Sequence, residues 1–244
     1  MKAIILAAGQ GTRLRPLTYA IPKPLLPVGG RPVIEYVLDN LKACPEIDEV
    51  HVAVSHMSSV IENYFAHAPR DGPDIHIVKT LGWETGGDIK TVLEENPQKE
   101  PLLVAYGDNV TRLDVPQLVR AHTPDACATV ALFPVPQEDT PRFGIGEMES
   151  RGARIRRFIE KPAAGQTTSN LANAGYFVLD PMALKDIPMR RFKLESELFP
   201  VWAARGQLNG QVQKLKLWID IGTIEAYRTA NRMADEILPP PGPR

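Results

Sequence analysis

The chain has 244 residues, of which 43% are hydrophobic and 23% are charged, and its formal net charge is −1. This length is enough for one large domain with a substantial core, and these proportions are ordinary for a globular protein. The near-neutral charge excludes binding to nucleic acid or to an anionic membrane surface through bulk charge. The sequence contains no signal-peptide pattern and no apolar run of membrane-spanning length, so we expect a cytoplasmic protein without a membrane partner.

The first half alternates short apolar segments with amphipathic ones. Strands are expected at residues 4–6, 50–54, 75–78 and 102–105, and helices at 32–44, 59–65 and 86–95. This alternation predicts βαβ units, and therefore an α/β fold with a Rossmann-like, doubly wound, mostly parallel sheet. In such sheets ligands bind beyond the carboxyl ends of the strands.

The second half has a different character. Strands are expected at 126–135, 144–148, 154–160, 171–179 and 211–216, with a short helix from Pro181 and longer helices at 195–204 and 224–237. This pattern predicts a β-rich insertion. The proline-rich residues 239–244 cannot continue a helix and are expected to form a disordered tail.

Residues 3–28 contain the strongest functional signal. A buried strand breaks into a loop in which Gly9 and Gly11 leave the backbone N–H groups uncovered, so that a phosphate chain can approach closely. Arg13 and Arg15 add permanent positive charge, and Lys23 follows on a segment stiffened by two prolines. This combination predicts a polyphosphate site.

Two familiar glycine motifs do not describe this loop. The dinucleotide fingerprint needs a third glycine where the chain has Leu14, and the Walker loop is absent. The alternative without a ligand is a sharp strand-to-helix turn with solvated arginines.

Other polar residues fit no catalytic pattern by spacing. Cys44 and Cys127 lie far apart and are expected to be buried free thiols. His51 and His76 fall in predicted strands and are interpreted as structural. The arginine-rich residues 151–157 lack interleaved aromatic residues, which favours a solvated strand face.

The stretch LAAGQGTRLRPLT followed by IPKPLLPV closely resembles the signature of sugar-1-phosphate nucleotidyltransferases. The resemblance is to short bacterial members, without the β-helix domain that many relatives carry. It implies the nucleotide-diphospho-sugar transferase type of fold, with a nucleotide-binding half at 1–115 and a sugar-phosphate-binding half at 116–238 of one domain. It also implies an NTP and a sugar 1-phosphate as substrates and Mg²⁺ as the cofactor.

Further motifs match the family in order and spacing, and the resemblance assigns them roles. Metal ligands would be Asp108 in Tyr-Gly-Asp-Asn and Asp220 in Trp-Ile-Asp-Ile-Gly-Thr. The sugar-binding residues would be Gly144, Glu160, Lys161 and Asn173, and the catalytic cations Arg13, Lys23 and Lys161. The nucleotide would contact Leu6, Ala8, Gly9, Gly11, Thr12, Arg13, Glu84, Gly86, Gly87 and Asp108.

These motifs do not decide the nucleobase of the NTP or the molecule that accepts the nucleotidyl group. Glu84 can accept the N1 and N2 hydrogens of guanine, which favours GTP, with UTP next; it can equally complement a helix dipole. The acceptor can be a sugar 1-phosphate or a phosphorylated alcohol such as choline phosphate. Direct in-line displacement is expected because no nucleophile pattern is present. The alternative is a non-catalytic nucleotide-sugar sensor or regulatory subunit. The sequence contains no pattern that sets the oligomeric state, and a homodimer is one alternative.

Overall fold

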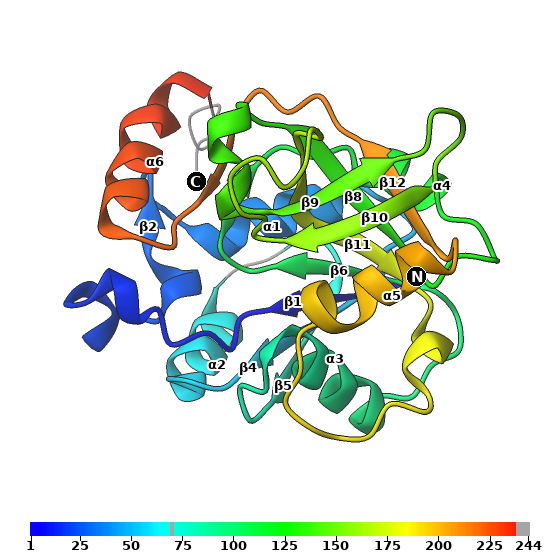
Figure 1. Ribbon diagram of the computed structural model, residues 1–244. Coiled ribbons are helices and arrows are strands. Elements are labelled where there is room, and N and C mark those ends of the chain that lie inside the picture. Colours follow the sequence, from blue (N-terminus) through cyan, green and yellow to red (C-terminus); the bar gives the residue numbers. More distant parts are fainter. Residues whose placement is uncertain (69–70, 238–244) are drawn as a thin grey trace.

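The computed structural model in Figure 1 describes residues 1–68 and 71–237, and the tail expected at 239–244 lies outside these ranges. The strands are β1 (Lys2–Leu6), β2 (Pro27–Val28), β3 (Arg31–Pro32), β4 (Glu49–Val54), β5 (Asp74–Lys79), β6 (Leu102–Tyr106), β7 (Asn109–Thr111), β8 (Ala128–Pro134), β9 (Gly144–Met148), β10 (Ile155–Glu160), β11 (Leu171–Leu179), β12 (Leu208–Val212) and β13 (Trp218–Asp220). The α-helices are α1 (Val33–Lys42), α2 (Ser58–His67), α3 (Glu84–Glu95), α4 (Val115–Arg120), α5 (Phe199–Ala204) and α6 (Ile224–Ile237).

The parallel strands of the first half form the predicted βαβ core. β1 pairs in parallel with β4 on one side and with β6 on the other, and β4 pairs in parallel with β5. The chain therefore adds strands first on one side of β1 and then on the other. This reversal is a topological switch point, where a crevice opens beyond the carboxyl ends of the two diverging strands. β1 and β6 end at this crevice.

The β-rich second half is joined to the same sheet through β11. β11 pairs antiparallel with β6, and the full path runs β10-β9-β11-β6-β1-β4-β5. β8 pairs with β11 and with β12. The fold class expected from the sequence is confirmed, with a parallel core inside a larger mixed sheet.

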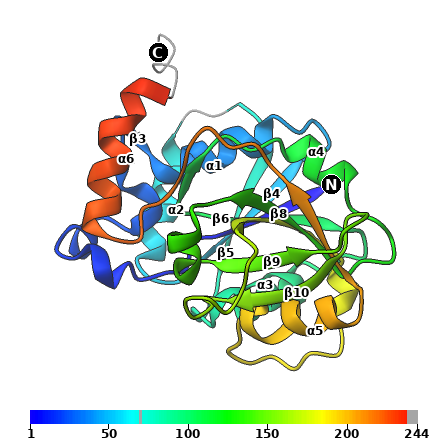
Figure 2. The same cartoon turned by 45° about the horizontal axis from the view of Figure 1, so that its top comes forward.

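Helices cover both faces of the sheet (Figures 1 and 2). The odd positions of β1 pack with α1, α2 and α4, whereas Ile4 packs with α3 and α5. α6 packs against β2 and β13 at the side of the sheet, over a third cluster that includes Leu14 and Leu26. The loop of residues 12–28 is thereby held by α6.

Some element boundaries differ from the predictions. The strand expected at 211–216 is β12, Leu208–Val212, because Leu208 and Gly210 are buried in register with β8. The helix expected at 195–204 begins as a π-helical turn, Leu194–Leu198, and continues as α5. The elements that were not predicted include β2, β3, α4, β7 and β13, each of which is too short to show a period.

The structure shows the surroundings of the two cysteines and of the arginine-rich residues 151–157. Cys44 is buried and Cys127 half-buried, and both are free thiols. Arg154 pairs with Asp125, and Arg156 lies 3.4 Å from Glu147, so acidic partners neutralise this arginine-rich face. Within residues 1–68 and 71–237 no helix is long and apolar enough to cross a membrane.

Candidate active site

The loop after β1 has the open backbone that a phosphate ligand needs. A Cβ on Gly9 would meet no atom within 4 Å, so this position is open space. Gly11 has φ +62°, and a Cβ there would lie 2.8 Å from the Thr18 methyl group. Thr18 also donates its hydroxyl to the Gly11 carbonyl at 2.8 Å. Gly11 is therefore required by the turn itself, whereas Gly9 leaves room for a ligand.

Lys23 joins two carboxylates that are far apart in the sequence. Its Nζ donates to Asp108 and lies 3.2 Å from Asp220 Oδ1. Asp108 follows β6 at the switch point, and Asp220 ends β13, which is paired to β7 with Asp220 opposite Asn109. The backbone N–H of Ile221 also donates to the Asp108 carbonyl at 3.2 Å. These backbone contacts bring Asp220 close to Asp108, and the binding of one Mg²⁺ by the pair stays a prediction.

The electrostatics of this trio reflect burial of like charges. Burial, together with the negative charge of Asp108, raises the pKa of Asp220, while Lys23 and Arg13 act in the opposite direction. Burial by itself would lower the pKa of Lys23, but the two carboxylates outweigh it and the pKa is raised. The ammonium is therefore held charged between two carboxylates that would otherwise repel each other.

The donor set at this point suits a hard divalent cation. Mg²⁺ is commonly bound through one or two carboxylates, with substrate phosphates and waters completing its shell. Asp108 and Asp220 supply such a pair beside the glycine loop, and no group of three or more His, Cys, Asp or Glu that could hold a metal occurs in the described part of the chain. The residues present fit Mg²⁺ that arrives with a nucleotide.

A cavity of about 860 Å³ lies over the switch point. Arg13, Lys23 and Asp108 line its polar side. The predicted nucleotide-binding residues that line it are Leu6, Ala8, Gly9, Gly11, Thr12, Arg13, Glu84 and Asp108.

A second cavity of about 530 Å³ adjoins the first. All of the predicted sugar-binding residues line it: Gly144, Glu160, Lys161 and Asn173. A Cβ on Gly144 would lie 2.6 Å from the Phe158 ring and 2.7 Å from Glu160 Oε2, so this turn is closely packed by both side chains. Lys161 has φ +51°, and its backbone N–H donates to the Phe143 carbonyl at 2.9 Å.

The two cavities share a wall. Arg13, Asp108 and Tyr106 line both of them, as do Glu84, Thr85 and Gly222. A Cβ on Gly222 would lie 3.1 Å from the Arg13 guanidinium, so this arginine sits close to the chain that carries Asp220. A group bound in one cavity would therefore lie next to a group bound in the other.

Glu84 lies on the shared wall in a strained conformation, with φ +62°. Its carboxylate accepts from Arg191 and lies 3.6 Å from Lys193 Nζ. The hydrogen bond from Arg191 is the largest cause of the lowered pKa of Glu84. The expected guanine acceptor is thus already paired with two cations.

Gly86 and Gly87 have a different surrounding from the one expected. A Cβ on Gly86 would lie 2.2 Å from the Phe192 ring, and one on Gly87 would lie 2.7 Å from the Arg190 carbonyl oxygen. Their N–H groups donate to the Phe192 carbonyl at 3.0 and 3.4 Å. Neither glycine lines the two cavities. Here glycine allows the segment around Phe192 to pack against the start of α3.

The cavity walls also hold residues that were given no role from the sequence, among them Tyr106, Arg191, Lys193 and Glu195. Tyr106 and Arg191 line the first cavity, and Tyr106, Lys193 and Glu195 line the second. Tyr106 directly precedes the Gly-Asp pair, which is a usable signal. Arg191, Lys193 and Glu195 carry no local pattern, because only tertiary packing brings their segment to α3.

Comparison with known proteins agrees with this geometry. The chain belongs to the nucleotidyl transferase family, whose model matches residues 2–236. It is similar to the UTP–glucose-1-phosphate uridylyltransferase of Synechocystis sp., with 35% identity over 95% of this chain and 63% of the relative. It is also similar to mannose-1-phosphate guanyltransferase beta-B of Xenopus laevis, with 33% identity over 94% of this chain and 63% of that relative.

The chain spans less than two thirds of the length of these curated relatives. A solved UDP-glucose pyrophosphorylase in complex with UDP-glucose superposes with a TM-score of 0.82 at 22% identity, covering 96% of this chain and 98% of that one. This likeness establishes the nucleotide-diphospho-sugar transferase fold.

Proposed function

We propose that this chain transfers a nucleotidyl group from an NTP to a sugar 1-phosphate, giving an NDP-sugar and pyrophosphate, with Mg²⁺ as cofactor. The observation that carries the proposal is the shared wall. A cavity with a phosphate-type glycine loop adjoins a cavity with a lysine and carboxylates, and Arg13 and Asp108 belong to both. Relatives that act on UTP or on mannose 1-phosphate support the same class.

The residues divide the chemical work as follows. Arg13 holds the phosphates that leave, and Lys23 neutralises charge at the phosphorus that is attacked. Lys161, which lines the acceptor cavity, orients the attacking phosphate oxygen. Mg²⁺ on Asp108 and Asp220 would supply further neutralisation of phosphate charge. Displacement in line, without a covalent enzyme intermediate, needs only this positioning and charge compensation.

GTP is proposed ahead of UTP as the nucleotide, because Glu84 lies on the nucleotide cavity and can accept hydrogens from guanine. To bind guanine in this way, Glu84 must give up its hydrogen bond from Arg191 and accept hydrogen bonds from the base instead. Glu84→Gln should then reduce the ratio of kcat/KM for GTP over UTP by about 10-fold. An unchanged ratio would assign base selection to other residues.

The test is a pyrophosphate-release screen of ATP, GTP, CTP, UTP and dTTP against a panel of hexose, heptose and amino-sugar 1-phosphates and choline phosphate, with Mg²⁺ or with EDTA. One productive pair that depends on Mg²⁺ is the expected result. Nucleotide binding by calorimetry without pyrophosphate release from any pair would instead favour a non-catalytic sensor on this fold.

A further inference from the structure

Glu195 brings a buried carboxylate to the wall of the acceptor cavity, beside the half-buried Glu160. The residue is only 6% exposed and lines the cavity together with Glu160 and Lys161. Its partners are neutral hydroxyl groups: Tyr106 donates to Oε1, and Thr85 donates to Oε2 at 2.6 Å. The Leu194 N–H in turn donates to the Thr85 hydroxyl at 3.1 Å, which leaves that hydroxyl free to donate to Glu195.

The backbone that carries Glu195 is unusual. Residues Leu194–Leu198 form a π-helical turn, closed by the Phe199 N–H on the Leu194 carbonyl. Such turns are rare, and they occur frequently at functional sites. Glu195 faces the cavity, whereas Glu197 on the same turn pairs with the exposed Arg190 at 2.7 Å.

Glu195 lies close to Glu160 and has no cationic partner among the residues that the structure describes. Within residues 1–68 and 71–237, no ion pair to Glu195 is present. Burial and then the negative charge of Glu195 raise the pKa of Glu160, while Lys161 and Lys193 oppose this. A buried and a half-buried carboxylate on the wall of one cavity are an arrangement typical of a functional site.

We propose that Glu195 is a specificity-determining residue, which accepts a hydrogen bond from a ring hydroxyl of the acceptor beside Glu160. This inference rests on the proposed function. A carboxylate has about four acceptor positions, and the two hydroxyl groups of Tyr106 and Thr85 use two of them. The remaining positions suit a polyhydroxylated sugar phosphate, whereas choline phosphate has no hydroxyl to donate. Tyr106 and Thr85 act as positioning residues.

The first experiment compares Glu195→Gln with Glu197→Gln, a matched control on the same turn. Glu195→Gln should lower kcat/KM for the sugar 1-phosphate by about 10- to 100-fold, because a hydrogen bond to a charged group is lost. The KM for the NTP should stay within about twofold in both variants, and Glu197→Gln should resemble the wild type. Glu195→Gln that matches the wild type for the acceptor would overturn the proposal.

The second experiment separates a contact with the substrate from a structural effect. With a series of monodeoxy sugar 1-phosphates, the difference between wild type and Glu195→Gln should vanish for the one analogue that lacks the contacted hydroxyl. An equal loss on every analogue, or a matching rise in the KM for the NTP, would overturn the proposal. If Glu195→Gln does not fold, Tyr106→Phe replaces it and should show the same analogue dependence with a smaller loss.

The two proposals fail in different ways. If the wild type releases no pyrophosphate with any sugar 1-phosphate, the proposed function fails and the role of Glu195 falls with it. If the wild type turns over and Glu195→Gln does so equally well, only the role of Glu195 is overturned.

Discussion

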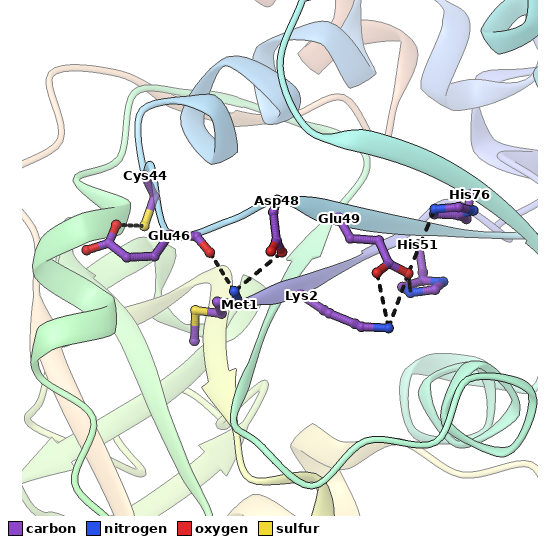
Figure 3. Close-up of polar contacts among 8 residues, drawn as sticks. All are labelled: Met1, Lys2, Cys44, Glu46, Asp48, Glu49, His51 and His76. Carbon is purple, nitrogen blue, oxygen red and sulfur yellow. Dashed lines mark hydrogen bonds and ion pairs between the residues drawn. The ribbon is translucent and has the colours of Figure 1, made fainter.

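The two ends of the parallel strands carry similar charged groups in very different arrangements. At the carboxyl ends, Lys23 lies between Asp108 and Asp220. At the amino ends, Lys2 lies 3.1 Å from Glu49, whose Oε1 is 2.7 Å from His51 Nε2 (Figure 3).

The difference lies in what brings the groups together. Lys2 and Glu49 are register partners on β1 and β4, and His51 and His76 are partners on β4 and β5, with their rings stacked at 5.4 Å. Neighbouring strands place these side chains together with no further requirement, and none of them lines the two cavities. A charge cluster that strand register alone produces is not evidence of a site.

The carboxyl-end cluster has no such origin. Lys23 is 85 residues from Asp108 and 197 residues from Asp220, and it meets them beside both cavities. Segments that are far apart in the sequence have to converge here. The cost of burying their charges has to be offset by pairing a cation with the two carboxylates. We therefore expect substitutions at the carboxyl-end cluster to reduce activity strongly and substitutions at the amino-end cluster to change it little.

The largest effect is expected from Asp108→Asn. It keeps the size of the side chain but removes a charge from the proposed metal site, so pyrophosphate release should fall by about 10³-fold or more. The midpoint of thermal unfolding should change little, and Glu49→Gln is the matched control at the opposite end. Similar activity in Asp108→Asn and Glu49→Gln would show that the two clusters do not differ in function.

Lys23→Met should have the next largest effect. In the proposed mechanism Lys23 neutralises the phosphate that reacts, so the loss of this cation should lower kcat by about 10²-fold or more. Because the ammonium no longer competes for Asp108 and Asp220, the nucleotide-free variant should bind Mn²⁺ more tightly, as measured by electron paramagnetic resonance. Lys161→Met, which leaves the carboxylate pair intact, should bind Mn²⁺ as the wild type does. Weaker Mn²⁺ binding by Lys23→Met would contradict the competition.

The amino-end cluster should affect stability as a function of pH. Burial lowers the pKa of His51, with Lys2 and His76 adding to this effect and Glu49 opposing it. The unfolded chain therefore binds a proton more readily than the folded protein, and stability should fall as the pH drops below about 6.5. Urea unfolding at pH 7.5 and pH 5.5 measures this change, which His51→Gln should reduce and Asp108→Asn should retain. Equal pH dependence in His51→Gln and wild type would exclude His51 as its source.

The smallest effect is expected from Lys2→Met. The Lys2 and Glu49 side chains are 35% and 27% exposed, and partly exposed ion pairs contribute about 0–1 kcal/mol. Denaturant unfolding should show a change in that range, and pyrophosphate release should stay within about twofold of wild type. A larger loss of activity would mean that the two ends of the sheet are coupled.

The sequence was informative where function depends on local order. Gly9, Arg13 and Asp108 each follow the end of a predicted strand, and the parallel sheet necessarily brings such positions to one edge. Glu160 and Lys161 do not follow this rule, because β10 runs opposite to β6; they were identified by their Glu-Lys-Pro motif.

The sequence was uninformative where a contact depends on packing between distant segments. The pairing of Glu84 with Arg191 and the packing of Phe192 on Gly86 both require a segment that returns to α3 about 100 residues later, and no periodicity encodes such a return. Glu195 was hidden for a further reason, since a π-helical turn reads as ordinary helix in sequence.

The position of β6 has a consequence for synthesis on the ribosome. β6 is apolar and buried, with β1 on one side and β11 on the other. When residues 1–106 have emerged, β1 is available, but the other edge of β6 stays unpaired until residues 171–179 have been translated. An unpaired apolar edge is a template for aggregation, so the nascent chain passes through an interval in which chaperone protection of this edge would matter most.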